Sequence, residues 1–121
     1  MGLGENIVNE KSYNFALKII KYSRQLRDAN EYVLSNQILK SGTSIGANIN
    51  ESIYSQSKKD FVNKLSIALK EANETLYWLK LIKDSNLISD KYTLELLKDI
   101  DEIIRLLVSI IKTTKKDIIE Q

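Results

Sequence analysis

The sequence predicts an all-α protein, folded as an antiparallel up-down-up-down four-helix bundle. Three observations favour this fold. The 121 residues include four glycines and no proline, a composition that favours long, uninterrupted helices. Apolar residues recur at intervals of three or four in four successive stretches, and strand-like alternation is missing throughout. Short polar segments separate the stretches, and helices joined by short connections pack antiparallel. We expect one domain, residues 1–121, with helices at about 6–29, 35–54, 58–84 and 91–115.

The first predicted helix, residues 6–29, is apolar on two sides. Its core side carries, at helical spacing, Val8, Phe15, Ile19, Tyr22 and Leu26. A different side carries Tyr13, Leu17 and Ile20, followed by Arg24. Such a helix is either central in its domain or packed against another subunit. Between Lys11 and Arg27 the chain has five basic residues and no acidic one, which indicates either a solvated helix face or a surface for an anionic partner.

The second predicted helix contains the most distinctive stretch, QILKSGTSIGANINESIY at residues 37–54, with Asn30 or Ser35 as its expected N-cap. Its apolar face consists of Ile38, Gly42, Ile45, Ile49 and Ile53. A parallel polar stripe consists of Gln37, Ser41, Ser44, Asn48 and Glu51. Because each interior glycine costs a helix about 1 kcal/mol relative to alanine, we expect a neighbouring helix to approach closely at Gly42 and Gly46.

The third and fourth predicted helices complete the bundle. A start signal, Ser57 to Asp60, precedes the third helix. Its core stripe comprises Phe61, Leu65, Ala68, Ala72, Leu76 and Leu79. Its second stripe comprises Ile67, Glu71, Glu74, Trp78 and Leu81. The core side of the fourth helix comprises Leu97, Ile100, Ile104, Leu107 and Ile111, with a flank of Leu96, Ile103 and Ile110.

The composition argues against an enzyme and against a bound cofactor or metal. There is no Cys and no His, so thiol catalysis, Cys-ligated zinc and the commonest general base are excluded. Glu51, Glu71 and Glu74 do not suffice for a di-iron site, which uses Glu-x-x-His on two helices. Ser41 and Ser44 have no base beside them. No apolar run is long enough to span a membrane, and we predict a cytoplasmic location.

The second stripes of the first and third helices predict assembly into a homo-oligomer. The stripe with Arg24 is apolar and basic, whereas the stripe with Glu71 and Glu74 is apolar and acidic. Complementary surfaces on one chain can meet head-to-tail between subunits and close into a ring. Trp, Tyr and Arg are also enriched at interface hot spots. The alternative is that these residues are scattered surface hydrophobes.

Two stretches resemble one protein family. QILKSGTSIGANINES is similar to the second-helix signature of four-helix-bundle proteins encoded in intervening sequences of 23S ribosomal RNA genes. The matching positions are Gln37, Lys40, Ser41, Ser44, Ile45, Asn48, Ile49 and Glu51. DFVNKLSIALKEANETLYWLKLI, residues 60–82, resembles the third helix of the family. The chain departs from the family at Ser52, where Gly is frequent, and at Lys40, where Arg is frequent.

The resemblance implies a four-helix bundle that forms pentameric rings, in a family whose members mostly have no established biochemical activity. A related branch, the accessory variability determinants of diversity-generating retroelements, binds nucleic acid and a reverse transcriptase. By analogy we expect RNA or another nucleic acid to bind through exposed cations, namely Lys18, Lys21, Arg27, Lys58, Lys59 and Lys64.

Two considerations limit that expectation. The net charge of +2 is too small to indicate nucleic-acid binding by itself. Aromatic residues that could stack on bases are not interleaved with these lysines, which argues against sequence-specific reading of single strands. The alternative function is a protein-interaction scaffold, or an accessory subunit of a reverse transcriptase with no nucleic-acid binding of its own. The polar stripe of the second helix is interpreted as a structural signature rather than a binding site.

Overall fold

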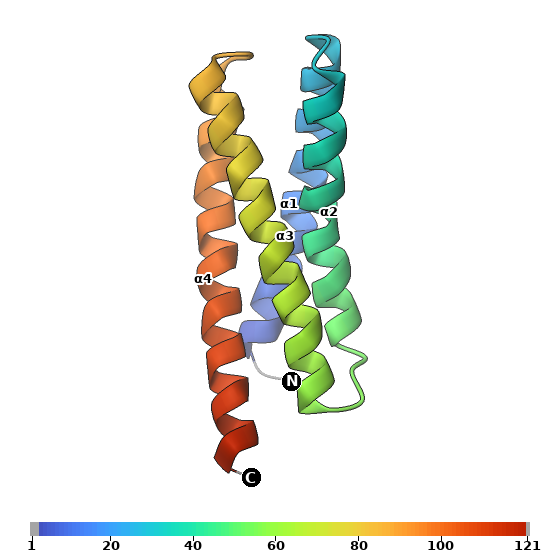
Figure 1. Ribbon diagram of the computed structural model, residues 1–121, viewed down its shortest axis with the longest axis vertical. Helices are drawn as coiled ribbons and strands as arrows, with labels where there is room; N and C mark the ends of the chain where they lie inside the picture. The colour runs from blue at the N-terminus through green and yellow to red at the C-terminus, as the bar shows by residue number, and fades with distance from the viewer. Residues whose placement is uncertain (1–2, 121) are drawn as a thin grey trace.

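The computed structural model describes residues 3–120, and over that range it contains four α-helices and no strand (Figure 1). The helices are α1 (Leu3–Asp28), α2 (Tyr32–Ser52), α3 (Lys58–Ser85) and α4 (Asp90–Glu120). Figure 1 shows successive helices running in opposite directions along the long axis of the molecule. The predicted all-α four-helix bundle is therefore confirmed.

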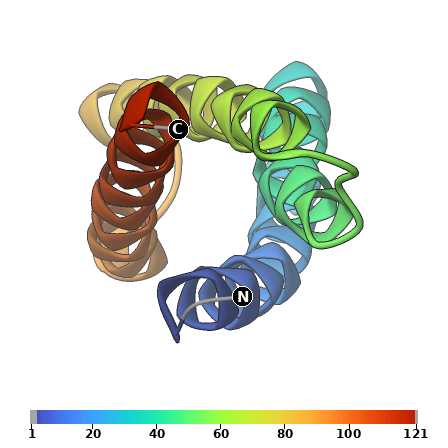
Figure 2. The ribbon, with the colours of Figure 1, turned by 90° about the horizontal axis from the view of Figure 1, so that it is seen from below.

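The helices follow one another around the bundle axis in chain order (Figure 2). α1 packs against α2 and α4, and α3 packs against α2 and α4. Packing is least extensive between α1 and α4, the first and last helices of the chain. This seam is the most open side of the bundle.

The connection between α1 and α2 differs from the prediction. Asn30 adopts the left-handed conformation, with φ of 64°, and the backbone N–H of Glu31 donates to the carbonyl of Leu26. Neither predicted N-cap residue caps α2. The N-cap position is occupied by Glu31, and Ser35 lies inside the helix and is buried. Its hydroxyl donates instead to the backbone carbonyl of Ser23 on α1 (2.7 Å). Asn30 accepts a hydrogen bond from the hydroxyl of Tyr32 (2.9 Å).

The ends of α3 follow the local sequence. Ser57 has an extended backbone, and its hydroxyl accepts a hydrogen bond from the N–H of Asp60 (3.0 Å), as the start signal predicts. Asn86 ends the helix in the left-handed conformation, with φ of 55°. α4 continues to Glu120, beyond the predicted end near residue 115.

Most of the predicted core is buried, but the buried face of α4 is rotated. All five core residues predicted for the first helix are buried. On α4, Leu96 and Ile103, predicted as a flank, are buried, whereas Leu97 and Ile104 are only half-buried. The reason is that α4 contacts both α1 and α3, so its buried arc is centred between these two neighbours.

α1 and α2 approach each other closely where α2 has its interior glycines. A Cβ atom added to Gly42 would lie 2.8 Å from Cγ2 of Ile19, too close for a real contact. A Cβ atom on Gly46 would lie 3.3 Å from the backbone oxygen of Ser12. The close approach expected from the sequence is thus observed at both positions, and it explains the tolerance of two poor helix formers.

Candidate assembly and nucleic-acid surfaces

The polar stripe of α2 makes its contacts within the bundle. The buried hydroxyl of Ser41 lies 2.9 Å from that of Thr75 on α3. Ser44 donates to the carbonyl of Lys40, and the amide of Asn48 donates to the carbonyl of Ser44 (2.8 Å). The carboxylate of Glu51 lies 3.5 Å from the amine of Lys64 on α3. Gln37, the remaining member, is exposed.

The second stripe of α1 lies on a surface of the bundle. Tyr13 is 66% exposed and Leu17 is 47% exposed. Arg24 is exposed as well, whereas Ile20 is half-buried. Tyr13 also lines a groove between α1 and α2, together with residues that include Thr43 and Gly46. The stripe therefore lies on the side of α1 that faces away from α4.

The second stripe of α3 combines exposed and half-buried residues. Ile67, Glu74 and Leu81 are exposed, whereas Glu71 and Trp78 are half-buried. Trp78 packs against the core, and its indole N–H is buried without a hydrogen-bond partner in the described part of the chain. A buried donor of this kind is uncommon in folded proteins.

The six cations predicted to contact nucleic acid differ in their surroundings. Lys18 lies 2.9 Å from Glu95 and 2.8 Å from Asp99, and Lys64 pairs with Glu51. The other four are exposed and form no ion pair with any residue from 3 to 120, namely Lys21, Arg27, Lys58 and Lys59.

The cations are also divided between the two ends of the bundle. Arg27 lies in the last turn of α1, at the top of Figure 1, and Lys21 lies two turns earlier. Lys58 and Lys59 lie in the first turn of α3, at the bottom of that figure. A helix the length of α1, 26 residues, extends about 39 Å. The predicted residues therefore form two groups rather than one continuous surface.

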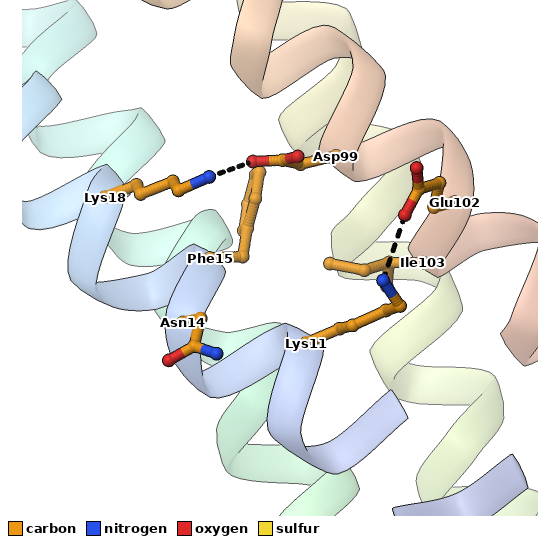
Figure 3. A pocket seen from close by; sticks show the side chains of 7 residues that line it. All are labelled: Lys11, Asn14, Phe15, Lys18, Asp99, Glu102 and Ile103. Atoms are coloured by element: carbon orange, nitrogen blue, oxygen red, sulfur yellow. Dashed lines mark hydrogen bonds and ion pairs between the residues drawn. The ribbon is translucent and has the colours of Figure 1, made fainter. Parts of the chain in front are cut away.

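The seam between α1 and α4 contains a groove closed by ion pairs (Figure 3). Lys11 bonds to Glu102 at 3.1 Å, and Lys18 bonds to Asp99. Hydrogen bonding to Asp99 and Glu95 raises the pKa of the Lys18 amine, and hydrogen bonding to Lys11 lowers the pKa of the Glu102 carboxyl. The residues lining this central groove are Lys11, Asn14, Phe15, Lys18, Asp99, Glu102 and Ile103. With its lysines paired to carboxylates, the central groove offers no excess positive charge to a phosphate.

Comparison with known proteins identifies the family. Residues 4–109 match the family described as 23S rRNA-intervening sequence protein. The chain belongs to this family. A solved structure from Bacteroides thetaiotaomicron, described as a protein with unknown function from the S23 ribosomal protein family, is 48% identical. The match covers 91% of this chain and 99% of that chain, with a TM-score of 0.86. No curated protein matches the chain.

Membership confirms the resemblance deduced from the helix signatures, but it brings no activity with it, because the solved relative is itself of unknown function. Two further observations concern this intervening-sequence protein. Within residues 3–120, no group of three or more metal-ligating side chains is close enough to hold a metal ion. None of the described helices is long and apolar enough to cross a membrane.

Sequence reasoning missed the contacts that α4 makes with α1. Tyr22 is buried, and its hydroxyl lies 2.7 Å from that of Thr93. Burial raises the pKa of the Tyr22 phenol, and this effect outweighs the lowering of the pKa by the hydrogen bond to Thr93. Tyr92, one residue earlier, lines a groove with Lys18 and Lys21. The two sides of this groove are at least 67 positions apart in the sequence, from Gln25 to Tyr92, and no local pattern connects them.

Proposed function

We propose that this intervening-sequence protein is a non-enzymatic helical bundle that assembles into a ring of identical subunits and binds RNA or another nucleic acid through exposed Lys and Arg. A pentamer is the expected ring size, by the family resemblance. The observation that carries the proposal is the pair of unpartnered stripes on α1 and α3.

The two stripes are both apolar, and the charged side chains that they carry are of opposite sign. Both expose large apolar side chains, with Tyr13 and Leu17 on α1 and Ile67, 45% exposed, on α3. Arg24 on the first stripe has no carboxylate partner in the described chain, and Glu74 on the second has no cation. Because the stripes are different surfaces, their contact is heterologous, and repetition around an axis closes a ring.

A ring supports nucleic-acid binding even though each chain carries a charge of only +2. Every unpaired cation of one subunit recurs in each copy, so weak phosphate contacts act together along one strand. Four cations without an ion pair among residues 3–120 are available for such contacts, namely Lys21, Arg27, Lys58 and Lys59. Lys18 and Lys64 contribute once their carboxylate partners are displaced. Affinity of this origin falls steeply with salt.

The assembly is tested by placing a charge in the α3 stripe. We expect Trp78→Glu and Ile67→Glu each to reduce the mass measured by light scattering from that of the ring to that of the monomer. The matched control is Val108→Glu, because Val108 is an exposed apolar residue on α4, which carries neither stripe. Ile67→Glu guards against misfolding of the Trp78 variant, since Ile67 is not part of the core. A folded Ile67→Glu variant with unchanged mass contradicts the interface.

The nucleic-acid part of the proposal is tested with the unmodified protein. We expect retention of single-stranded RNA at low salt and its loss as salt is raised. No retention at low salt contradicts it.

A protein-interaction scaffold, including an accessory subunit of a reverse transcriptase, is the second candidate. It is favoured by the ion pairing of Lys11, Lys18 and Lys64, which reduces the number of cations free for phosphate. It predicts that a protein partner co-purifies and remains bound after nuclease treatment.

A further inference from the structure

A second groove on the seam between α1 and α4 combines an aromatic ring with lysines. It lies beside the central groove and shares Lys18 with it. We call it the Tyr92 groove, and its lining residues are Lys18, Lys21, Tyr22, Gln25, Tyr92, Glu95 and Leu96. Its volume of about 270 Å³ is just below the range typical of pockets for drug-sized ligands, so it suits a single planar ring system.

The floor of the Tyr92 groove is largely apolar, and its one hydroxyl group already has a hydrogen-bond partner. Tyr22 and Leu96 are buried beneath it, and the Tyr22 hydroxyl is bonded to Thr93. The rim is different, because Tyr92 is 49% exposed and presents a ring at the surface. The amine of Lys91 lies 6.0 Å from the centre of that ring. Across the groove, Lys21 has no carboxylate partner in the described chain.

From this arrangement we propose that the Tyr92 groove holds one base of a single-stranded nucleic acid, with the base stacked on Tyr92 and the flanking phosphates at Lys21 and Lys91. Stacking of bases on aromatic side chains beside cations is the general mode of single-strand binding. For the edge of the base, the side-chain amide of Gln25 supplies a hydrogen-bond donor, and the carboxylate oxygens of Glu95 supply acceptors. The negative charge of Glu95 directs the phosphates to the two lysines instead.

The inference rests on the proposed nucleic-acid binding and adds where and how the base is bound. It is compatible with the proposed ring, because Lys18 reaches α4 from one side of α1 whereas Tyr13 faces the groove with α2. One strand can therefore occupy the Tyr92 groove while the α1 stripe contacts another subunit.

The test measures binding of a fluorescent single-stranded RNA across a series of salt concentrations. We expect Tyr92→Ala to weaken binding by about 5- to 150-fold, the range for loss of one stacked base, without changing the dependence on salt. Tyr92→Phe keeps the ring and is expected to bind normally. Lys21→Ala removes a phosphate contact from every subunit. It should weaken binding and also reduce the slope of log affinity against log salt concentration by about 0.7 for each subunit that the strand contacts. Tyr77→Ala is the matched control, since Tyr77 is an exposed tyrosine on α3.

Each outcome decides one part of the argument. An RNA that lacks bases should bind the unmodified protein as weakly as complete RNA binds the Tyr92→Ala variant. If the unmodified protein binds RNA and Tyr92→Ala behaves like Tyr77→Ala, the groove assignment is wrong while the proposed function stands. If the unmodified protein binds no RNA at low salt, both fail. Light scattering on each variant excludes a change of assembly as the cause.

Discussion

Gly42 shows how a single residue sets the distance between two helices. Its missing side chain leaves room for Ile19 of α1, whose Cγ2 atom lies 2.8 Å from the position that a Cβ atom of residue 42 would take. Alanine at this position has a better helix propensity by about 1 kcal/mol, but overpacking a core costs about 1–3 kcal/mol. The steric effect is therefore expected to outweigh the propensity.

A double-mutant cycle at Gly42 and Ile19 tests this balance. We expect Gly42→Ala alone to lower the free energy of unfolding, and Ile19→Ala alone to lower it by about 2–5 kcal/mol. In the double variant the new methyl group fills part of the space that Ile19 vacated. The stability lost in the double variant should therefore be smaller than the sum of the two single losses, by about 0.5–3 kcal/mol. Urea unfolding measures all three variants, and simple additivity would show that the two side chains do not compete for the same space.

At the scale of helices, the apolar periodicity predicts where each helix lies but not how it is rotated in the bundle. The core of α1 follows directly from its spacing, and Ser57 marks the start of α3. On α4 the apolar arc is so wide that spacing alone does not separate Leu96 from Leu97, and contact with two neighbours decides which one is buried. Ser35 shows that residue type alone can also mislead. Serine is typical of a helix N-cap, but here Ser35 lies inside α2 and donates a hydrogen bond to α1.

The seam between α1 and α4 depends on charge more than the other helix contacts do. The pKa of Glu102 is lowered, mainly by its hydrogen bond to Lys11, so its contribution to stability is present above the ordinary pKa of 4.5 and is lost as pH falls below it. The pKa of Lys18 is raised, so its contribution is present below the ordinary pKa of 10.5 and is lost only at higher pH. Between these limits the seam keeps its ion pairs.

Glu102→Gln tests the acid limit. We expect the variant to melt at a lower temperature than the unmodified protein at pH 7, and this difference to shrink as the pH is lowered to 3, because Glu102 becomes increasingly protonated and its ion pair is lost. The effect should be small, because both members of the Lys11 pair are exposed to solvent. Asp101→Asn serves as a control, since among residues 3–120 Asp101 pairs only with Arg105 of its own helix. A difference that is the same at both pH values would argue against the ion pair as its cause.

At the scale of the whole molecule, side chains from distant parts of the sequence meet in ways that no single stretch indicates. In the first helix Tyr22 directly follows Lys21 but is buried, and the fold instead places the exposed Tyr92 of α4 beside Lys18 and Lys21. Conversely, Lys58 belongs with Arg27 in the predicted set, and the fold places the two at opposite ends of the bundle. Charge can be counted along a chain, but its distribution over a surface depends on topology.

This separation allows the two groups of cations to be tested against each other. If a base occupies the Tyr92 groove, the strand follows the end of the bundle that carries Lys21 and Arg27. We then expect the double variant Lys21→Ala/Arg27→Ala to bind RNA more weakly and to reduce the salt slope by about 1.4 for each subunit that the strand contacts, the value for two phosphate contacts with a single strand. The matched double variant Lys58→Ala/Lys59→Ala removes the same charge and should keep both the affinity and the slope. Equal losses in the two variants would instead mean that RNA runs along the full length of the bundle, since about 39 Å separates the ends of a helix such as α1.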